Sequence, residues 1–426
     1  MDKNQTVFAL LVAIDKYHPD SSVPHLSGCK NDISRIDAFL SGRIEDGYQP
    51  LILTDEQATK KNIIAGFETH LAQATKDDSI LFYYSGHGSQ SMTARKYWRS
   101  EPDKLDETLV AYDSRTKEGR DLADKELAYL ISKLAESGAH ITIIMDCCHS
   151  GDGTRKIFGP DVASRRMITD ERSREANDYF FSDRADAETR SLEKSPSKTG
   201  WVDLPKGGHI LLAACRSSET AKEKIIEGER RGIFSHYLLE SLQAANSTTT
   251  YRDLFMRTNA RVRANISEQS PQMDSTGDTS LNSSFLGGSI QNPPPHFTLA
   301  FRRDPESQTD LGWFINGGEI HGIKQQGEET TELAIFNFSS SDDDLRDLTQ
   351  ALALIKVTQV EPTRSQISLL SENRFELDAN TTYKAVVTNL PIVPLLVKLE
   401  GDKAACKLVS QALNCLLYTS PSPRDS

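Results

Sequence analysis

Two short polar turns in the chain carry a candidate nucleophile and a candidate base. Cys147 and Cys148 stand in the turn DCCHSG, and His87 stands in the turn SGHG. A cysteine attacks carbonyl carbon as its thiolate, and a neighbouring imidazole is the usual group that generates the thiolate near neutral pH. These residue types therefore predict a Cys–His dyad, provided that the fold brings the two turns together.

Each turn follows an apolar run of strand length. Residues 141–145 precede the cysteine turn, and residues 80–84 precede the histidine turn. Buried parallel strands have such continuous apolar sequences, and open α/β sheets keep their chemistry at the carboxyl ends of these strands. Apolar residues at helical spacing over 127–134, with Asp124 as the N-cap and Gly138 as a stop, predict a βαβ crossover between the two runs. We therefore expect both turns at one edge of a parallel sheet.

The rest of the first two thirds of the chain extends this α/β pattern. Apolar runs predict more strands, and capping residues followed by helical spacing predict more helices. Residues 152–206 are rich in Arg, Asp, Glu and Ser, which is typical of a long exposed insert. The further strands are expected at 6–14, 51–53 and 209–214, and the further helices before Gly42, after Thr59, over 234–242 and after Thr250.

Length and composition divide the chain into several parts. At 426 residues the chain is too long for one typical domain. We expect an α/β domain at 1–290 with the insert 152–206, a Pro-rich linker at 291–296, and a separate, mostly β accessory domain at 297–414. The β domain is predicted from strand-like patterns at 297–301, 332–338, 353–360, 366–370 and 382–388.

The end of the chain is expected to have a different origin from the rest. Cys415 to Asp425, CLLYTSPSPRD, resembles an in-frame translation of a sequencing adapter. Residues 415–426 are therefore set aside, and the native chain is expected to continue beyond Asn414, which would leave the β domain truncated.

Charge and cysteine content limit the partners and the compartment. The net charge of −12 disfavours nucleic acids and anionic membrane surfaces as partners. Six cysteines without regular spacing do not form a disulfide framework, and no early segment reads as a signal peptide or a membrane span. We expect a cytoplasmic protein with reduced thiols.

Four motifs together resemble the metacaspases, and more broadly the caspase-like cysteine peptidases. They are GCKNDI, YYSGHGSQ, DCCHSG and GIFSHYLLESL, and the match extends from Thr6 to about Gly288. The resemblance implies a caspase-like three-layer α/β fold and a cysteine endopeptidase. It also implies that Cys148 is the nucleophile, that His87 is the base, and that the N–H groups of Gly88 and Cys148 form the oxyanion hole. Cys147 should point to the opposite face of its strand.

The resemblance also implies a substrate pocket for Lys or Arg. In metacaspases the positions that match Cys29, Asp32, Ser85 and Asp146 line this pocket, and Asp146 shares a strand face with Cys148 because it lies two residues earlier. Asp32 has an alternative role as the N-cap of the helix that begins near Ile33. Protein or peptide substrates with Lys or Arg at the cleaved bond are the expected partners.

The basic residues of the insert predict self-processing. An enzyme with an acidic pocket would meet its own insert at high effective concentration. Cleavage is expected between the large and small parts of the catalytic domain, after one of the basic residues of 152–206. The insert contains the candidates Arg165, Arg166, Arg172, Arg174, Arg184, Arg190, Lys194 and Lys198.

Cofactors and alternative functions complete the predictions. No organic cofactor is expected, but metacaspases often need calcium as an activator. Asp124 fits a ligand position, whereas Lys125 stands where another acid is expected.

His149 is the alternative base, although a neighbour in sequence rarely points at the nucleophile. A metal site made of Cys147, Cys148, His149 and His87 is disfavoured, because adjacent ligands close a tetrahedral shell poorly. The alternative function is a weak or inactive caspase-like scaffold.

Overall fold

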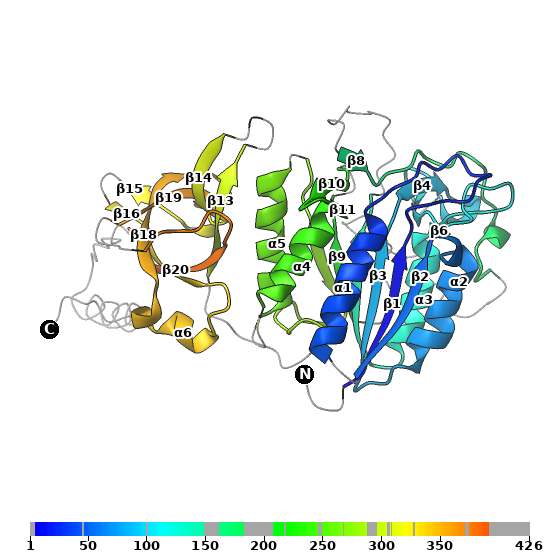
Figure 1. Ribbon diagram of the computed structural model, residues 1–426, viewed down its shortest axis with the longest axis horizontal. Helices are drawn as coiled ribbons and strands as arrows, with labels where there is room; N and C mark the ends of the chain where they lie inside the picture. The colour runs from blue at the N-terminus through cyan, green and yellow to red at the C-terminus, as the bar shows by residue number, and fades with distance from the viewer. Residues whose placement is uncertain are drawn as a thin grey trace, which may run out of the picture.

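The computed structural model shows a layered α/β body followed by a β barrel (Figure 1). None of the helices in the described part of the chain is both long and apolar enough to span a bilayer. The described residues are 5–44, 47–98, 101–148, 162–182, 208–216, 219–245, 249–266, 268–287, 296–304, 307, 309–326, 329–370 and 375–391.

A six-stranded sheet forms the centre of the α/β body. Its strand order is β12-β9-β7-β3-β1-β2, and all neighbours are parallel except β12, which runs antiparallel to β9. The apolar runs of the sequence become its central strands, which are buried on both faces. The strands are β1 (Val7–Ala13), β2 (Tyr48–Thr54), β3 (Ser79–Ser85), β7 (His140–Asp146), β9 (His209–Ala213) and β12 (Gln272–Thr276).

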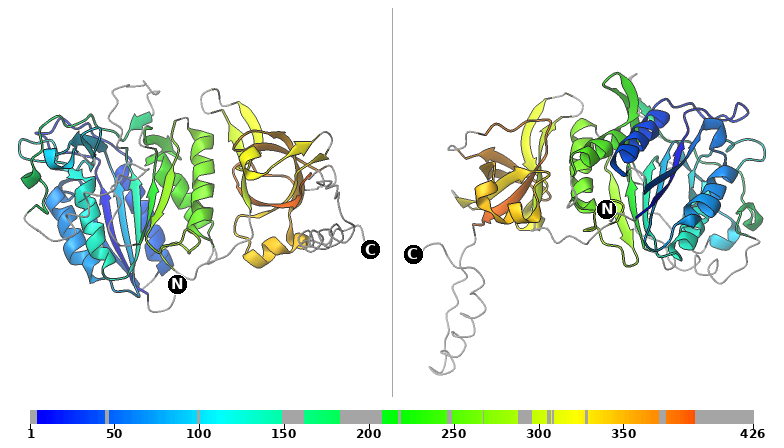
Figure 2. Two further views of the ribbon diagram at one scale, coloured as in Figure 1. Left: turned by 180° about the vertical axis from the view of Figure 1, so that it is seen from behind. Right: turned by 60° about the horizontal axis from the view of Figure 1, so that its bottom comes forward.

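Helices cover both faces of this sheet, which gives three layers (Figures 1 and 2). Residues of α2 (Lys60–Ala65) and α3 (Asp124–Ala135) pack with one face of the strands. A π-helical turn and a short 3-10 turn continue α2 to Gln73. Residues of α1 (Cys29–Ile44), α4 (Ile233–Gln243) and α5 (Tyr251–Asn265) belong to the core on the other face. The mainly parallel α/β architecture agrees with the fold class expected from the sequence.

The helix starts follow the predicted caps with one exception. The Thr59 side chain accepts from the N–H of Asn62, and the Thr250 side chain accepts from the N–H of Asp253. Asp124, however, is the first residue of α3 and not its cap, which is Ala123.

Two small antiparallel sheets lie in regions where the sequence predicted no strands. Their strands are short and carry many polar residues, so they lack the apolar alternation that signals a strand. The first contains β4 (Gly88–Met92), β5 (Leu105–Leu109) and β6 (Leu122–Ala123). The second contains β8 (Val162–Ser164), β10 (Lys222–Ile226) and β11 (Glu229–Gly232).

A closed six-stranded barrel follows the α/β body, in the order β13-β14-β19-β18-β17-β20. The five strand-like patterns of the sequence all become barrel strands, and β14 was missed. A buried cluster that includes Leu299, Ile335 and Ile355 fills the barrel. The elements are β13 (Phe297–Arg303), β14 (Asp310–Ile315), β17 (Glu332–Asn337), β18 (Ala353–Val360), β19 (Ser365–Leu369), β20 (Tyr383–Asn389), the hairpin β15 (Gln325–Gln326) and β16 (Glu329–Thr330), and α6 (Asp342–Arg346).

The barrel contacts the α/β body through polar side chains of α5. The Arg257 guanidinium donates to Thr382 Oγ1 over 2.6 Å, and Asp253 lies 2.9 Å from His296 Nε2 and 3.6 Å from Lys384 Nζ. The barrel therefore docks against the last helix of the α/β body and not against the strand ends that carry the two candidate turns.

The predicted exposure of the insert is wrong for part of residues 162–182, the range of the insert that the structure describes before β9. Arg165 is completely buried and Arg174 is 4% exposed. Their charges are compatible with burial because both side chains pair with carboxylates that lie far away in the sequence. Several ranges lie outside the described residues. They are the remainder of the insert, residues 291–295 of the linker, and residues 392–426.

Candidate active site

The sheet brings the two predicted turns side by side. Strands β3 and β7 are parallel, and their register pairs Ser85 with Asp146. His87 and Cys148 each follow two residues later, so both leave the sheet at the same edge. This arrangement agrees with the expectation from the βαβ pattern.

His87 is held as a neutral imidazole with one ring nitrogen available. Its Nε2–H donates to the carbonyl of Pro24 over 2.9 Å, and its ring lies 5.4 Å from the ring of Tyr17. Nδ1 has no hydrogen-bond partner among the described residues. Burial lowers the pKa of His87 to about 4. Since Nε2 carries the proton, Nδ1 has a free lone pair and can accept a proton.

Cys148 is completely buried, and its thiol faces residues that lie between β9 and β10. Sγ lies 3.6 Å from Sγ of Cys215 and contacts the backbone N–H of Ala221. Within the described residues, no hydrogen bond joins this thiol to His87. The structure therefore brings the two turns together without forming the dyad's hydrogen bond, and the Cys148 side chain would have to turn for a direct proton transfer.

A buried acidic pocket lies beside Cys148 and holds the side chain of Arg165. The pocket consists of Asp32, Asp146, Glu223 and Ser85, and we call it the arginine pocket. The guanidinium nitrogens of Arg165 lie 2.7 Å from Asp32 Oδ2, 2.9 Å from Asp146 Oδ2, 3.4 Å from Glu223 Oε2 and 2.8 Å from Ser85 Oγ. A completely buried guanidinium needs such partners, because an unpaired buried charge is very costly.

The backbone of Arg165 is bound as an extended strand across the same site. Residues 162–164 pair antiparallel with β10, and the N–H of Arg165 donates to the carbonyl of Ala221 over 2.9 Å. The carbonyl oxygen of Arg165 accepts from the N–H of Gly88 at 3.1 Å and from that of Cys148 at 3.3 Å. These two donors are the pair that the sequence analysis named as an oxyanion hole. A Cβ atom at position 88 would overlap the backbone of Cys148, so this approach requires glycine.

The N-cap role that we considered for Asp32 is wrong. Helix α1 already begins at Cys29, so Asp32 lies inside its first turns. Asp15 satisfies the start of this helix instead, because its carboxylate accepts from the N–H groups of Cys29 and Lys30. Asp32 is left to bind Arg165 and the Nε–H of Arg231.

Three residues in or next to the arginine pocket were missed in the sequence. Glu223 is a third carboxylate at the guanidinium, and Arg231 bonds to Asp32. Ser235 donates its hydroxyl and its N–H to Asp146 Oδ2 over 2.5 and 3.1 Å. The motif GIFSHYLLESL that contains Ser235 supported the family resemblance, but its spacing gave no signal that this hydroxyl reaches strand β7.

Burial sets the protonation of the groups around the pocket. Burial raises the pKa of Asp146, and the neighbouring Arg165 opposes this increase. The pKa of the buried Cys29 thiol is raised well above its usual range by burial, again opposed by Arg165. Cys29 is therefore a neutral thiol near the guanidinium.

The two adjacent cysteines lie on opposite faces of the sheet. Cys147 belongs to the apolar cluster under α2 and α3, whereas Cys148 belongs to the cluster on the α1 and α4 side. The predicted alternation is therefore confirmed. His149, the alternative base, lies outside the described residues.

The carboxylates near Asp124 surround an ammonium group. Lys125 Nζ lies 3.6 Å from Asp124 Oδ1, 2.7 Å from Asp106 Oδ1 and 2.6 Å from Glu101 Oε1. Across the described ranges, no group of three or more His, Cys, Asp or Glu side chains is arranged to hold a metal ion. The residues around Asp124 do not fit a calcium ion, because the ammonium already lies among the oxygens that would bind it.

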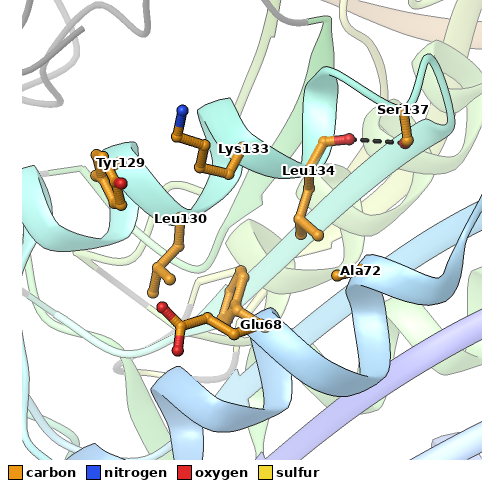
Figure 3. A pocket seen from close by; sticks show the side chains of 8 residues that line it. Glu68, Ala72, Tyr129, Leu130, Lys133, Leu134 and Ser137 are labelled. Carbon is orange, nitrogen blue, oxygen red and sulfur yellow. Dashed lines mark hydrogen bonds between the residues drawn. The ribbon is translucent and has the colours of Figure 1, made fainter. Parts of the chain in front are cut away.

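A hollow of about 330 Å³ lies elsewhere, between the α2 region and α3 (Figure 3). Figure 3 shows Glu68 and Lys133 at this hollow, together with Leu130 and Leu134. It contains none of the candidate catalytic residues.

Comparison with known proteins identifies the family to which the α/β body is similar. Residues 6–281 match the family model of the caspase domain. Metacaspase-1 of Eremothecium gossypii is 26% identical over 310 residues, which cover 65% of this chain and 66% of that protein. Metacaspase-1B of Aspergillus oryzae is 24% identical over 289 residues, which cover 61% of this chain and 66% of that protein. This chain thus spans slightly less than two thirds of these two relatives.

One solved structure was compared in the same way. A crystal structure of a Geobacter sulfurreducens protein matches with 22% identity and a TM-score of 0.47, covering 66% of this chain and 97% of that one.

Proposed function

This chain belongs to the caspase domain family of cysteine peptidases, and from this premise we propose that it is an endopeptidase that cleaves after Lys or Arg and processes itself at the bond Arg165–Arg166. The observation that carries the proposal is the position of Arg165. Its side chain lies in the arginine pocket, and its carbonyl oxygen meets the N–H groups of Gly88 and Cys148. A substrate residue before the cleaved bond would need both contacts.

The proposed chemistry uses His87, Cys148 and the two N–H groups that bind this carbonyl. His87 Nδ1 accepts the proton of the Cys148 thiol once that side chain turns toward it. The thiolate attacks the carbonyl carbon of Arg165, and the Gly88 and Cys148 N–H groups stabilise the oxyanion, which is worth roughly 3–4 kcal/mol per donor in related acyl transfers. The protonated imidazole then gives its proton to the amine of Arg166, and water releases the acyl-enzyme.

Three carboxylates explain the preference for a cation in the pocket. Asp32, Asp146 and Glu223 all face the Arg165 guanidinium. A neutral side chain would leave these buried acids without a partner, so substrates with apolar residues at this position should be rejected. Lysine, with a single ammonium, can contact fewer of these oxygens at once than arginine.

Mass spectrometry of the purified chain tests the proposal. Wild type should yield a fragment that begins at Arg166, Cys148→Ala should remain whole, and Arg165→Gln should lose cleavage at this bond. Arg172→Gln is the matched control, since Arg172 is an arginine of the same segment that pairs with Asp170 outside the pocket. Fluorogenic peptides with Arg, Lys or Asp before the cleaved bond test cleavage in trans.

Two results would contradict the proposal. Fragments that end in Asp would show that the pocket does not select a cation. An uncut wild type that also fails to hydrolyse the Arg and Lys peptides would favour the alternative of a weak or inactive scaffold. The contact of Cys148 with Cys215 in place of His87 is the observation that keeps this alternative open.

A further inference from the structure

A second buried cation lies among carboxylates at the start of α3. Lys125 is 1% exposed, and its ammonium lies within ion-pair distance of Glu101, Asp106 and Asp124. We call these four residues the lysine cage. Burial alone would lower the pKa of Lys125, but Asp124, Asp106 and Glu101 outweigh it, so the pKa is raised and the ammonium stays charged.

The position of the ammonium excludes a divalent ion from the same place. Its nitrogen is 2.6 and 2.7 Å from oxygens of Glu101 and Asp106. Calcium binds carboxylate oxygens at about 2.3–2.6 Å, so an ion bound to these oxygens would overlap Nζ. Glu107 is a further carboxyl group near the cage. Burial raises its pKa well above the usual value, which favours its neutral form.

The lysine cage is connected to the chain that follows Arg165. Asp106 binds Lys125 through one oxygen, and its other oxygen accepts from Tyr179 Oη at 2.5 Å and from Arg174 at 3.3 Å. Arg174 also donates to the carbonyl of Asp121. The cage therefore holds residues 166–182, which we call the downstream segment.

The downstream segment is aligned along β4. Backbone hydrogen bonds join Met167 N–H to the Gly88 carbonyl, Asp170 N–H to the Gln90 carbonyl, and Met92 N–H to the Asp170 carbonyl. Because Gly88 also binds the carbonyl of Arg165, the downstream segment and the candidate cleavage site share one strand as their support.

We propose that the Lys125 ammonium is a tethered cation that replaces a metal ion: it neutralises the lysine cage from within, so that the downstream segment is aligned without any divalent cation. A chain whose cation is covalently attached should not respond to calcium. Removing that cation and adding an acid at the same position should open a site for a divalent ion, because four carboxylates around one cavity are the ligands that calcium prefers.

The test measures calcium binding and thermal stability in a Cys148→Ala background, so that its result does not depend on whether the chain is an active peptidase. Melting temperature is recorded in EGTA and in calcium at about 1 mM, well above the dissociation constants of sensor sites. The Cys148→Ala chain should show the same melting temperature in both and no calcium binding in calorimetry. Cys148→Ala with Lys125→Asp should melt lower in EGTA and recover by at least about 5 °C in calcium.

Lys133→Asp in the same background is the matched control. Lys133 lies on the same helix, is partly exposed and pairs with Glu136 at the surface. This variant should not gain a response to calcium. Control and cage variants therefore carry the same change in charge and differ in its position.

The result for each variant can contradict the proposal. Calcium binding by the Cys148→Ala chain with a raised melting temperature would show that a metal ion occupies this region despite Lys125. A folded Lys125→Asp variant that ignores calcium would show that the cage is not a cation site. If Lys125→Asp does not fold in either buffer, the Cys148→Ala chain and the Lys125→Ala variant decide in the same assays, since Lys125→Ala should also gain stability in calcium.

Discussion

The arginine pocket and the lysine cage both pair a buried cation with carboxylates, but the two cations belong to different kinds of segment. In each, a buried cation is surrounded by three carboxylates. Arg165 follows a strand of only three residues in a segment that crosses the nucleophile, whereas Lys125 lies inside helix α3. Under the proposed function, the arginine of a substrate would take the place of Arg165, whereas Lys125 is fixed in its helix. Similar carboxylate clusters would then serve substrate selection in one place and structure in another.

The largest effect on activity is expected for a change in the arginine pocket. Asp146→Asn should lower kcat/KM for Arg and Lys peptides by roughly 10³-fold, because a buried guanidinium that loses one partner costs about 3–5 kcal/mol. Steady-state kinetics with fluorogenic peptides measures this loss. Glu229→Gln is the control, since Glu229 is a surface carboxylate on β11 that pairs with Arg35. Equal losses in both variants would mean that the pocket has no special role.

Removing the cation of the lysine cage should lower stability strongly without changing specificity. In the Cys148→Ala background, Lys125→Met should lower the free energy of unfolding by roughly 3–4 kcal/mol, because three buried carboxylates lose their cation. Arg165→Met should cost less than about 2 kcal/mol, since its three-residue strand can move away and let water reach the pocket acids. Urea unfolding compares the two variants. A larger loss in Arg165→Met would reverse the assignment of exchangeable and permanent cations.

The sequence reveals the sheet better than it reveals either cluster. The strand ends at His87 and Cys148 follow continuous apolar runs, and Asp146 shares a face with Cys148 by simple alternation. The burial of Arg165 and Arg174 could not be predicted, because charged composition is typical of exposed loops and the compensating partners are distant. Arg174 meets Asp106, and Arg165 meets Asp32, only after the fold is formed. The only sign of the lysine cage in the sequence was Lys125, which stands where an acid was expected.

The charge state of His87 should report whether the arginine pocket is covered. Burial, helped by the nearby charge of Arg165, lowers the pKa of His87 to about 4, whereas burial alone lowers that of His140 to about 4. NMR titration of the Cys148→Ala chain should find both values low. Arg165→Gln should raise the pKa of His87 toward about 6.5 and leave His140 as the internal control. An unchanged His87 would mean that its surroundings do not depend on the segment around Arg165.

The same depressed pKa predicts how stability depends on pH. Between about pH 6.5 and pH 4 the unfolded chain binds a proton at His87 that the folded chain does not, so stability is complete above that range and falls as the pH drops through it. The loss should reach roughly 3 kcal/mol by pH 4 for this group. Urea unfolding at several pH values measures it, and His87→Gln should reduce the slope. A slope that His87→Gln leaves unchanged would contradict the burial of a neutral imidazole.

The smallest effect is expected at the thiol next to the nucleophile, and it separates position from chemistry. Cys147 is buried in the apolar cluster under α2 and α3, and burial raises the pKa of its thiol well above the usual range, so it is protonated and faces away from Arg165. Cys147→Ser should cost about 1–2 kcal/mol of stability, because a hydroxyl is buried in an apolar site, and it should leave self-processing intact. Cys148→Ser should abolish processing with a smaller loss of stability, because the N–H of Ala221 can donate to the new hydroxyl. Mass spectrometry and urea unfolding of the two variants measure both properties. If Cys147→Ser were the uncut variant, the nucleophile would have been assigned to the wrong face of β7, and the arginine pocket would lie on the opposite side of the sheet from the reaction.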